Sequence, residues 1–85
     1  MDFEYPAFLV DEERNKLYDD NLKLVVDVVE NYLGRGVSLA VLFHAGREGL
    51  AEAAANHSFT ANYDFKYFAM YYIRKHIIGT FREST

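Results

Sequence analysis

Residues Asn62–Phe81 read N-Y-D-F-K-Y-F-A-M-Y-Y-I-R-K-H-I-I-G-T-F, and this stretch decides the fold. Apolar side chains recur in it at steps of three and four, which is the spacing of one buried face of an α-helix. They are Phe65, Phe68, Ala69, Tyr72, Ile73, His76 and Ile77. A second face is left for Tyr67, Tyr71, Arg74, Lys75 and Ile78. The pattern predicts a long helix that begins near Asp64 and carries more rings than one core face needs.

The second face of this helix combines outward rings with positive charges. Unpaired bases stack on aromatic rings while phosphates meet cations, so such a face suits single-stranded nucleic acid. Packing against another helix, in a dimer or in a second core layer, would bury the same rings. The residues of this helix leave both interpretations open.

The sequence before this stretch predicts two more helices. Asp11 is a good N-cap, and apolar residues then continue with helical spacing until the Gly34-Arg35-Gly36 triplet, which predicts a helix over residues 12–33. Its apolar positions are Tyr18, Leu22, Val25, Val26, Val29, Tyr32 and Leu33. Ser38 is the expected cap of the next helix.

The second helix contains two glycines that lower helix stability, and one of them lies in its buried stripe. The members of this stripe are Leu39, Leu42, Phe43, Gly46, Leu50, Ala53 and Ala54. Gly46 and its neighbour Gly49 each cost roughly 1 kcal/mol in a helix relative to alanine, so we expect close helix packing there. Residues 55–63 read as a loop. We therefore expect an all-α, compact three-helix domain over residues 11–85, preceded by an irregular segment over residues 1–10.

Composition excludes several classes of protein. The 85 residues suffice for one domain, cysteine is absent, and no apolar run approaches the ~20 residues of a membrane span. The N-terminus does not resemble a signal peptide, which favours a cytoplasmic location without membrane contact. The net charge of −4 argues against a classical duplex-binding protein. Residues 1–30 carry −6, residues 31–62 carry 0 and residues 63–85 carry +2, a polarity that suits a nucleic-acid-binding C-terminal end but also arises without function.

Candidate catalytic groups are few. His44, Glu48 and Glu52 are spaced four apart and could present a metal or a proton-transfer pair, but a solvated face with i,i+4 contacts is the favoured interpretation. His57 is expected in a loop without a partner, and His76 as a hydrogen-bonded residue at the edge of the core. No nucleophile elbow or phosphate loop is present. We expect no enzyme, no metal and no cofactor.

A series of motifs begins at Asn21: N-L-K-L-V at 21–25, Tyr32, Arg35-Gly36, G-R-E-G-L at 46–50 and Y-D-F-K-Y-F-A-M-Y-Y-I-R at 63–74. With this series the chain resembles region 2 of housekeeping-type bacterial RNA polymerase sigma factors. Family members typically read Asn-Leu-Arg-Leu-Val, then an aromatic residue, an Arg-Gly turn, Gly-x-x-Gly-Leu and Tyr-x-Phe-x-x-Tyr-Ala-x-Trp-Trp-Ile-Arg. The resemblance needs no gap and covers most of the 85 residues.

The resemblance implies a helical domain that docks on the beta-prime clamp helices of core RNA polymerase and opens the promoter −10 element. It implies that rings and cations around the last helix capture unstacked single-stranded promoter DNA, and by position these are Tyr63, Phe68, Tyr71, Tyr72 and Arg74. Lys75, on the same exposed face of the helix, completes the predicted DNA-binding set. The resemblance places the polymerase-facing surface on the second helix, around Val41, His44, Ala45 and Glu48.

The chain also departs from the family pattern. Val41, His44 and Ala45 stand where the family has acidic and amide residues, which removes charge-assisted contacts to a basic clamp. Thr60 and Ala61 replace basic loop residues. The family's glutamine and threonine that read duplex bases are replaced by Lys75 and Ile78, and neither can make glutamine's paired donor and acceptor contact.

These departures leave an alternative open, a degenerate sigma-like module that binds a regulator or itself through the apolar Val41–Ala45 patch. Segments that read the −35 element are not part of the sequence, so we expect an excised domain or a stand-alone relative.

Overall fold

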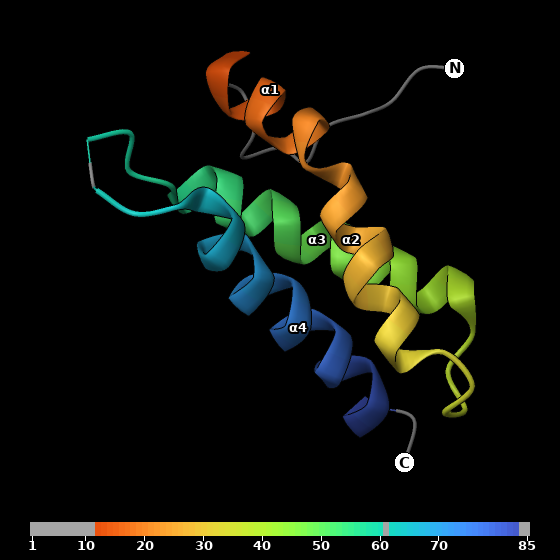
Figure 1. Ribbon diagram of the computed structural model, residues 1–85. Helices are drawn as coiled ribbons and strands as arrows, with labels where there is room; N and C mark the ends of the chain where they lie inside the picture. The colour runs from red at the N-terminus through yellow and green to blue at the C-terminus, as the bar shows by residue number, and fades with distance from the viewer. Residues whose placement is uncertain (1–11, 61, 84–85) are drawn as a thin grey trace.

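The fold is given by a computed structural model that describes residues 12–60 and 62–83 (Figure 1). The elements are α1 (Glu12–Asp20), α2 (Leu22–Val29), a 3-10 turn η1 (Glu30–Tyr32), α3 (Leu39–Asn56) and α4 (Phe65–Glu83). No strand occurs in this part of the chain, so the all-α class is confirmed. No helix within it is long and apolar enough to cross a membrane. The expected N-cap Asp11, the segment 1–10 and Ala61 lie outside the described residues.

The first expected helix is broken at Asn21, which corrects the prediction of one helix over residues 12–33. The side-chain amide of Asn21 donates to the carbonyl of Leu17 at 2.8 Å, the acceptor that its own backbone N–H would use in a continuous helix. That N–H bonds the carbonyl of Tyr18 instead, at 3.2 Å. Asparagine side chains compete with helical hydrogen bonds in this way. The chain therefore turns between α1 and α2.

The turn before α3 and the first residues of α3 and α4 have the conformations that the sequence predicted. Gly34 and Gly36 adopt positive φ angles of 78° and 98°, which glycine reaches without strain. The hydroxyl of Ser38 accepts a hydrogen bond from the backbone N–H of Val41 at 3.2 Å, as an N-cap should. At the start of α4, a carboxylate oxygen of Asp64 accepts from the N–H of Lys66 at 3.0 Å. The predicted cap Ser38 is confirmed, and so is the predicted start of the last helix near Asp64.

Several apolar residues that the sequence pattern assigned to buried helix faces are exposed. Leu39, expected in the buried stripe of α3, is 58% exposed because it occupies the first turn, beyond the contact with α4. Val26 and Leu33 are also exposed, while Val28 is buried. On α2 only the positions facing α3 and α4 are covered. The fully enclosed side chains come from α1 to α4 and include Tyr18, Val25, Leu42, Leu50, Ile73 and Ile77.

The main interface joins α3 to α4, which lie side by side in Figure 1. A Cβ atom built on Gly49 would lie 2.7 Å from the Cα atom of Ile73, and one built on Gly46 would lie 2.6 Å from a side-chain methyl of Val25. Both distances are shorter than any real carbon contact. The two costly glycines therefore have the close-packing role predicted for them, and at Gly49 the partner is backbone.

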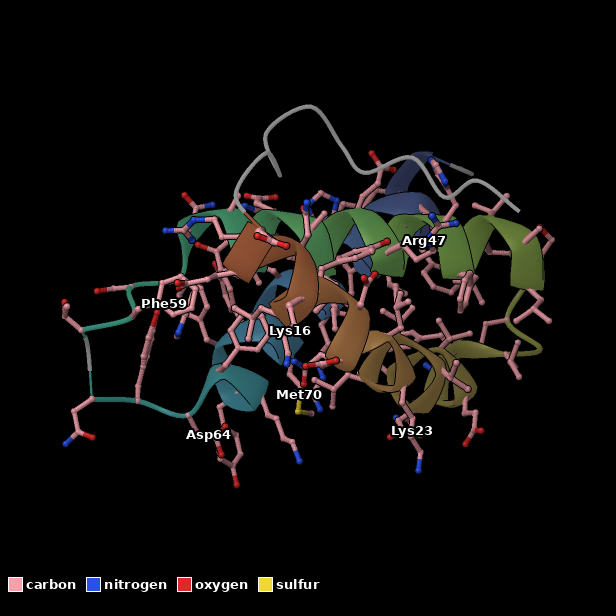
Figure 2. The ribbon with its side chains drawn as sticks, turned by 90° about the horizontal axis from the view of Figure 1, so that it is seen from above. Lys16, Lys23, Arg47, Phe59, Asp64 and Met70 are labelled. Atoms are coloured by element: carbon pink, nitrogen blue, oxygen red, sulfur yellow. The ribbon has the colours of Figure 1, made fainter. Side chains whose placement is uncertain are left out.

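The loop between α3 and α4 is organised around His57, which corrects the expectation that this residue has no partner. Arg14 of α1 donates to the carbonyls of Ala54 and His57, at 2.6 and 2.9 Å, and so caps the C-terminal end of α3. The ring of His57 meets the rings of Phe59 and Phe65 edge to face. Phe59 marks this end of the molecule in Figure 2.

The hydrogen bonds of His57 fit a neutral ring. Its Nδ1 atom lies 2.9 Å from the hydroxyl of Tyr63, and the same hydroxyl accepts from the N–H of Ser58 at 3.0 Å. Burial, followed by the positive charge of Arg14, lowers the pKa of His57 below its ordinary value. A neutral Nδ1 can accept the hydroxyl proton of Tyr63.

We predict that Gly49→Ala destabilises the domain by about 1–3 kcal/mol, because the added methyl meets immobile backbone of α4. The matched control is Gly79→Ala on α4, where an added Cβ has nothing within 4 Å. This control should gain about 0.5–1 kcal/mol from helix propensity. Urea unfolding followed by circular dichroism measures both. Equal stabilisation by the two substitutions would contradict the close contact at Gly49.

We predict that the stability of the domain falls as the pH drops below 6.5, partly through His57. The unfolded chain binds a proton at the ordinary pKa of 6.5, before the folded protein does. The contribution is complete above that value and is lost as the pH falls through it toward the lower folded pKa. Unfolding of wild type and His57→Gln at several pH values should show the steeper loss in wild type. An NMR titration midpoint of His57 at or above 6.5 would contradict the prediction.

Candidate nucleic-acid interface

The buried and the exposed side chains of α4 lie on different faces of the helix, as the periodicity predicted. Ala69, Ile73 and Ile77 are fully buried against the other helices. Tyr67 and Tyr71 are 75% and 65% exposed. Such exposure of two large rings on one helix is unusual, because tyrosine normally hides most of its apolar ring. The described part of the chain does not pack a second layer over them.

Four rings form a continuous series that we call the ring row, and its members are Tyr63, Phe68, Tyr72 and Tyr71. Tyr63 meets Phe68 edge to face with centroids 5.0 Å apart, and Phe68 meets Tyr72 at 5.0 Å. Tyr71 meets Tyr72 at 5.3 Å. Each contact has the perpendicular geometry that aromatic pairs prefer. The row extends from the loop around His57 onto the outer side of α4.

The ring row resolves a conflict between the two sequence arguments. Helical periodicity assigned Phe68 and Tyr72 to the core, whereas the resemblance assigned them to DNA. Both side chains are half-buried and pack against the core from its edge. Each can therefore support the fold with one part of its ring and present another part to a ligand.

Positive charge accompanies the ring row. The ammonium of Lys75 lies 5.9 Å from the ring centroid of Tyr72, and Arg74 is exposed beside it. Residues 65–82 of α4 include no acidic side chain. By contrast, residues 12–30 carry six acids and three bases. The outer face of α4 is thus the part of an acidic protein that attracts an anion.

The predicted polymerase-facing residues of α3 do not form one exposed set. Val41 is 47% exposed, and His44 and Glu48 form an exposed i,i+4 ion pair at 3.1 Å. Ala45 is only 6% exposed, which corrects its place on the predicted surface. Most of its side chain is covered by the core, and the little that is exposed lines a hollow with Glu48 and Lys75.

An apolar groove of about 580 Å³ lies next to Val41, between α2 and the start of α3. Its lining residues are Val26, Val29, Glu30, Leu33, Leu39, Ala40 and Phe43. Sequence reasoning missed this groove because it placed Val26, Leu33 and Leu39 in the core. The exposure of these three residues depends on how α2 packs against α3, which the sequence pattern does not give.

The histidines and carboxylates do not gather into a metal centre. Glu52 turns away from His44 and Glu48 and meets Nε2 of His76 at 2.5 Å, linking α3 to α4. The predicted edge-of-core hydrogen bond of His76 is confirmed. In residues 12–60 and 62–83, no three His, Cys, Asp or Glu side chains could share a metal ion.

Comparison with known proteins finds relatives among the proteins named RNA polymerase sigma factor SigA. The chain is 32% identical to the protein of Nostoc sp. over 75 residues, which is 88% of this chain and 19% of the relative. It is 33% identical to that of Listeria monocytogenes over 66 residues, 78% of this chain and 18% of the relative. It is 36% identical to that of Clostridium acetobutylicum over 64 residues, 75% of this chain and 17% of the relative.

The chain thus spans about a fifth of the length of the curated relatives it matches. No family model matches it, and no solved structure does. The matched region includes the series of motifs from Asn21 to Arg74 that suggested the resemblance. On these grounds the chain is a domain of the bacterial RNA polymerase sigma factor family.

Proposed function

We propose that this domain acts in transcription initiation as a region 2 module, docking on core RNA polymerase and capturing an unpaired strand of promoter −10 DNA. The observation that carries the proposal is the ring row beside Arg74 and Lys75 on a helix face without acidic residues. Rings and cations in one row are the two elements that single-strand binding requires.

The domain would capture the strand by binding unpaired bases more tightly than paired ones, and this needs no catalysis. A paired and stacked base cannot reach the ring row, whereas an unpaired base can stack on it. Stacking contributes about 1–3 kcal/mol per base, so two or three rings bias the equilibrium of the promoter toward its open form. The domain would thereby stabilise a melted strand in proportion to the bases it holds.

The ring row is held in place before any ligand arrives. The hydroxyl of Tyr63 is fixed by Ser58 and His57, and its ring rests against Phe68. Side chains that are already ordered lose less conformational entropy on binding. The loop around His57 therefore supports the proposed interface although it need not touch DNA itself.

Docking on polymerase would use the exposed residues of α3, namely Val41, His44 and Glu48. The resemblance points to the beta-prime clamp helices as the partner, and this chain meets them with an apolar residue at position 41. The exposed valine lowers the electrostatic part of such a contact and raises its apolar part. Ala45 contributes only by fixing how α3 packs.

The groove between α2 and α3 favours a second candidate function. A module that had lost promoter opening could bind a regulator or another copy through this apolar surface, since exposed apolar patches mark interaction sites. This candidate needs no DNA binding by α4. The two candidates are therefore separated by measurements on different helices.

The DNA assignment predicts that the double variant Tyr71→Ala, Arg74→Ala binds a −10-like single strand roughly tenfold or more weakly, because it loses one stacking ring and one phosphate contact. Fluorescence anisotropy measures the affinity. The matched control is Leu39→Ala, Lys23→Ala, which removes an exposed apolar residue and a cation from α3 and α2. Unfolding curves should be alike. Unchanged affinity in the α4 variant would contradict the assignment.

The docking assignment predicts that Val41→Glu strengthens binding to purified core RNA polymerase, because it adds a charge-assisted contact to a basic clamp. Asn56→Glu adds the same charge near the other end of α3 and should have no effect. Analytical co-elution with core polymerase measures both. Weaker binding by Val41→Glu, or no binding by the wild type, would favour the apolar interaction module.

A further inference from the structure

A hollow of about 480 Å³ lies on the outer face of α4, beside the ring row. We call it the outer hollow, and its lining residues are Tyr67, Met70, Tyr71, Arg74, Lys75 and Ile78. They occur at steps of three and four, so they line one strip of the helix surface. Figure 2 shows Met70 and Asp64 on the side of the molecule away from α3, whereas Arg47 lies along α3.

Tyr67 is the least engaged ring of the described chain. It is 75% exposed and makes no ring contact with any other described residue, whereas every member of the ring row meets a neighbour. Most of its apolar surface therefore lies in water. Leaving it in water costs free energy in proportion to that area, which a stacking ligand would recover.

The outer hollow and the ring row share two side chains. Tyr71 lines the hollow and also meets Tyr72 edge to face. Lys75 lines the hollow while its ammonium lies 5.9 Å from the ring centroid of Tyr72. A ligand that leaves the ring row at Tyr72 thus reaches the hollow across one side chain. The two surfaces are contiguous.

The charges of the hollow decide between two kinds of occupant. An apolar helix laid over it would bury Arg74 and Lys75. None of the side chains that line the hollow is acidic, and Glu48 of α3 lines a neighbouring hollow with Lys75 but not with Arg74. Burying unpaired cations is strongly unfavourable. A nucleic-acid strand brings phosphates to the same cations and a flat, apolar base to Tyr67. Charge complementarity therefore selects the strand.

We infer that the outer hollow seats one further unpaired base of the bound single strand, stacked on Tyr67, with its flanking phosphates on Arg74 and Lys75. The inference rests on the proposed single-strand binding and extends it to Tyr67, which the family resemblance does not assign to DNA. Met70 and Ile78 supply the apolar floor. The site is thus a base-binding subsite next to the ring row.

The test uses short single-stranded DNA oligonucleotides, each with an abasic site at one position, and measures affinity by fluorescence anisotropy. Wild type, Tyr67→Ala and Tyr67→Phe are compared. On the intact strand, Tyr67→Ala should bind roughly fivefold or more weakly, and Tyr67→Phe should keep wild-type affinity because it keeps the ring. One abasic position should weaken binding to wild type and have no further effect on Tyr67→Ala.

Two results would overturn the inference. Wild-type affinity in Tyr67→Ala would show that the hollow holds no base, and equal sensitivity of both proteins at every abasic position would show the same. If Tyr67→Ala is unaffected while the Tyr71→Ala, Arg74→Ala variant is weakened, the hollow fails and the proposed function stands. If wild type binds no oligonucleotide, both fail. Circular dichroism shows that the variants are folded.

Discussion

The close approach of α3 to α4 at Gly49 is the constraint on which the remaining structure depends. The backbone of α4 lies where any side chain at this position would stand. This contact fixes both the separation of the two helices and the rotation of α4 about its own axis. That rotation buries Ile73 and leaves Tyr67 and Tyr71 in water. A helix pair held by larger side chains would have a wider separation and a softer rotation. The exposed face of α4 therefore depends on the absence of a side chain at Gly49.

The loop after α3 connects the packed helices to the ring row through a series of contacts. Arg14 closes the end of α3. Burial, followed by the positive charge of Arg14, lowers the pKa of His57, which favours the neutral ring that can accept the hydroxyl proton of Tyr63. Tyr63 then fixes Phe68 on the edge of the core. A residue of α1 is thus coupled to the ring row through two consecutive contacts, Arg14 with His57 and His57 with Tyr63. Packing and electrostatics act here on the same side chains.

The sequence predicted the outline of this arrangement and not its details. Periodicity placed the faces of α4 correctly, because its burial is a property of one regular helix. It failed at Asn21, where a side chain replaces a backbone hydrogen bond, and at His57, whose partners are distant in the chain or in an irregular loop. Leu39 and Val26 were assigned to the core because periodicity reports a face but not how far a neighbouring helix extends over it. The groove between α2 and α3 was missed for that reason.

Half-burial of the ring row has a further consequence for any ligand it holds. A fully exposed ring has greater freedom and loses more of it on binding, whereas a fully buried ring offers no surface. Phe68 and Tyr72 lie between these limits, while Tyr71 and Tyr67 approach the exposed one. Exposure therefore does not change steadily along α4, because the exposed rings Tyr67 and Tyr71 alternate with the half-buried rings Phe68 and Tyr72. A strand bound along it would be gripped most firmly at Phe68 and Tyr72, and the subsite at Tyr67 would contribute mainly through the apolar area that it removes from water.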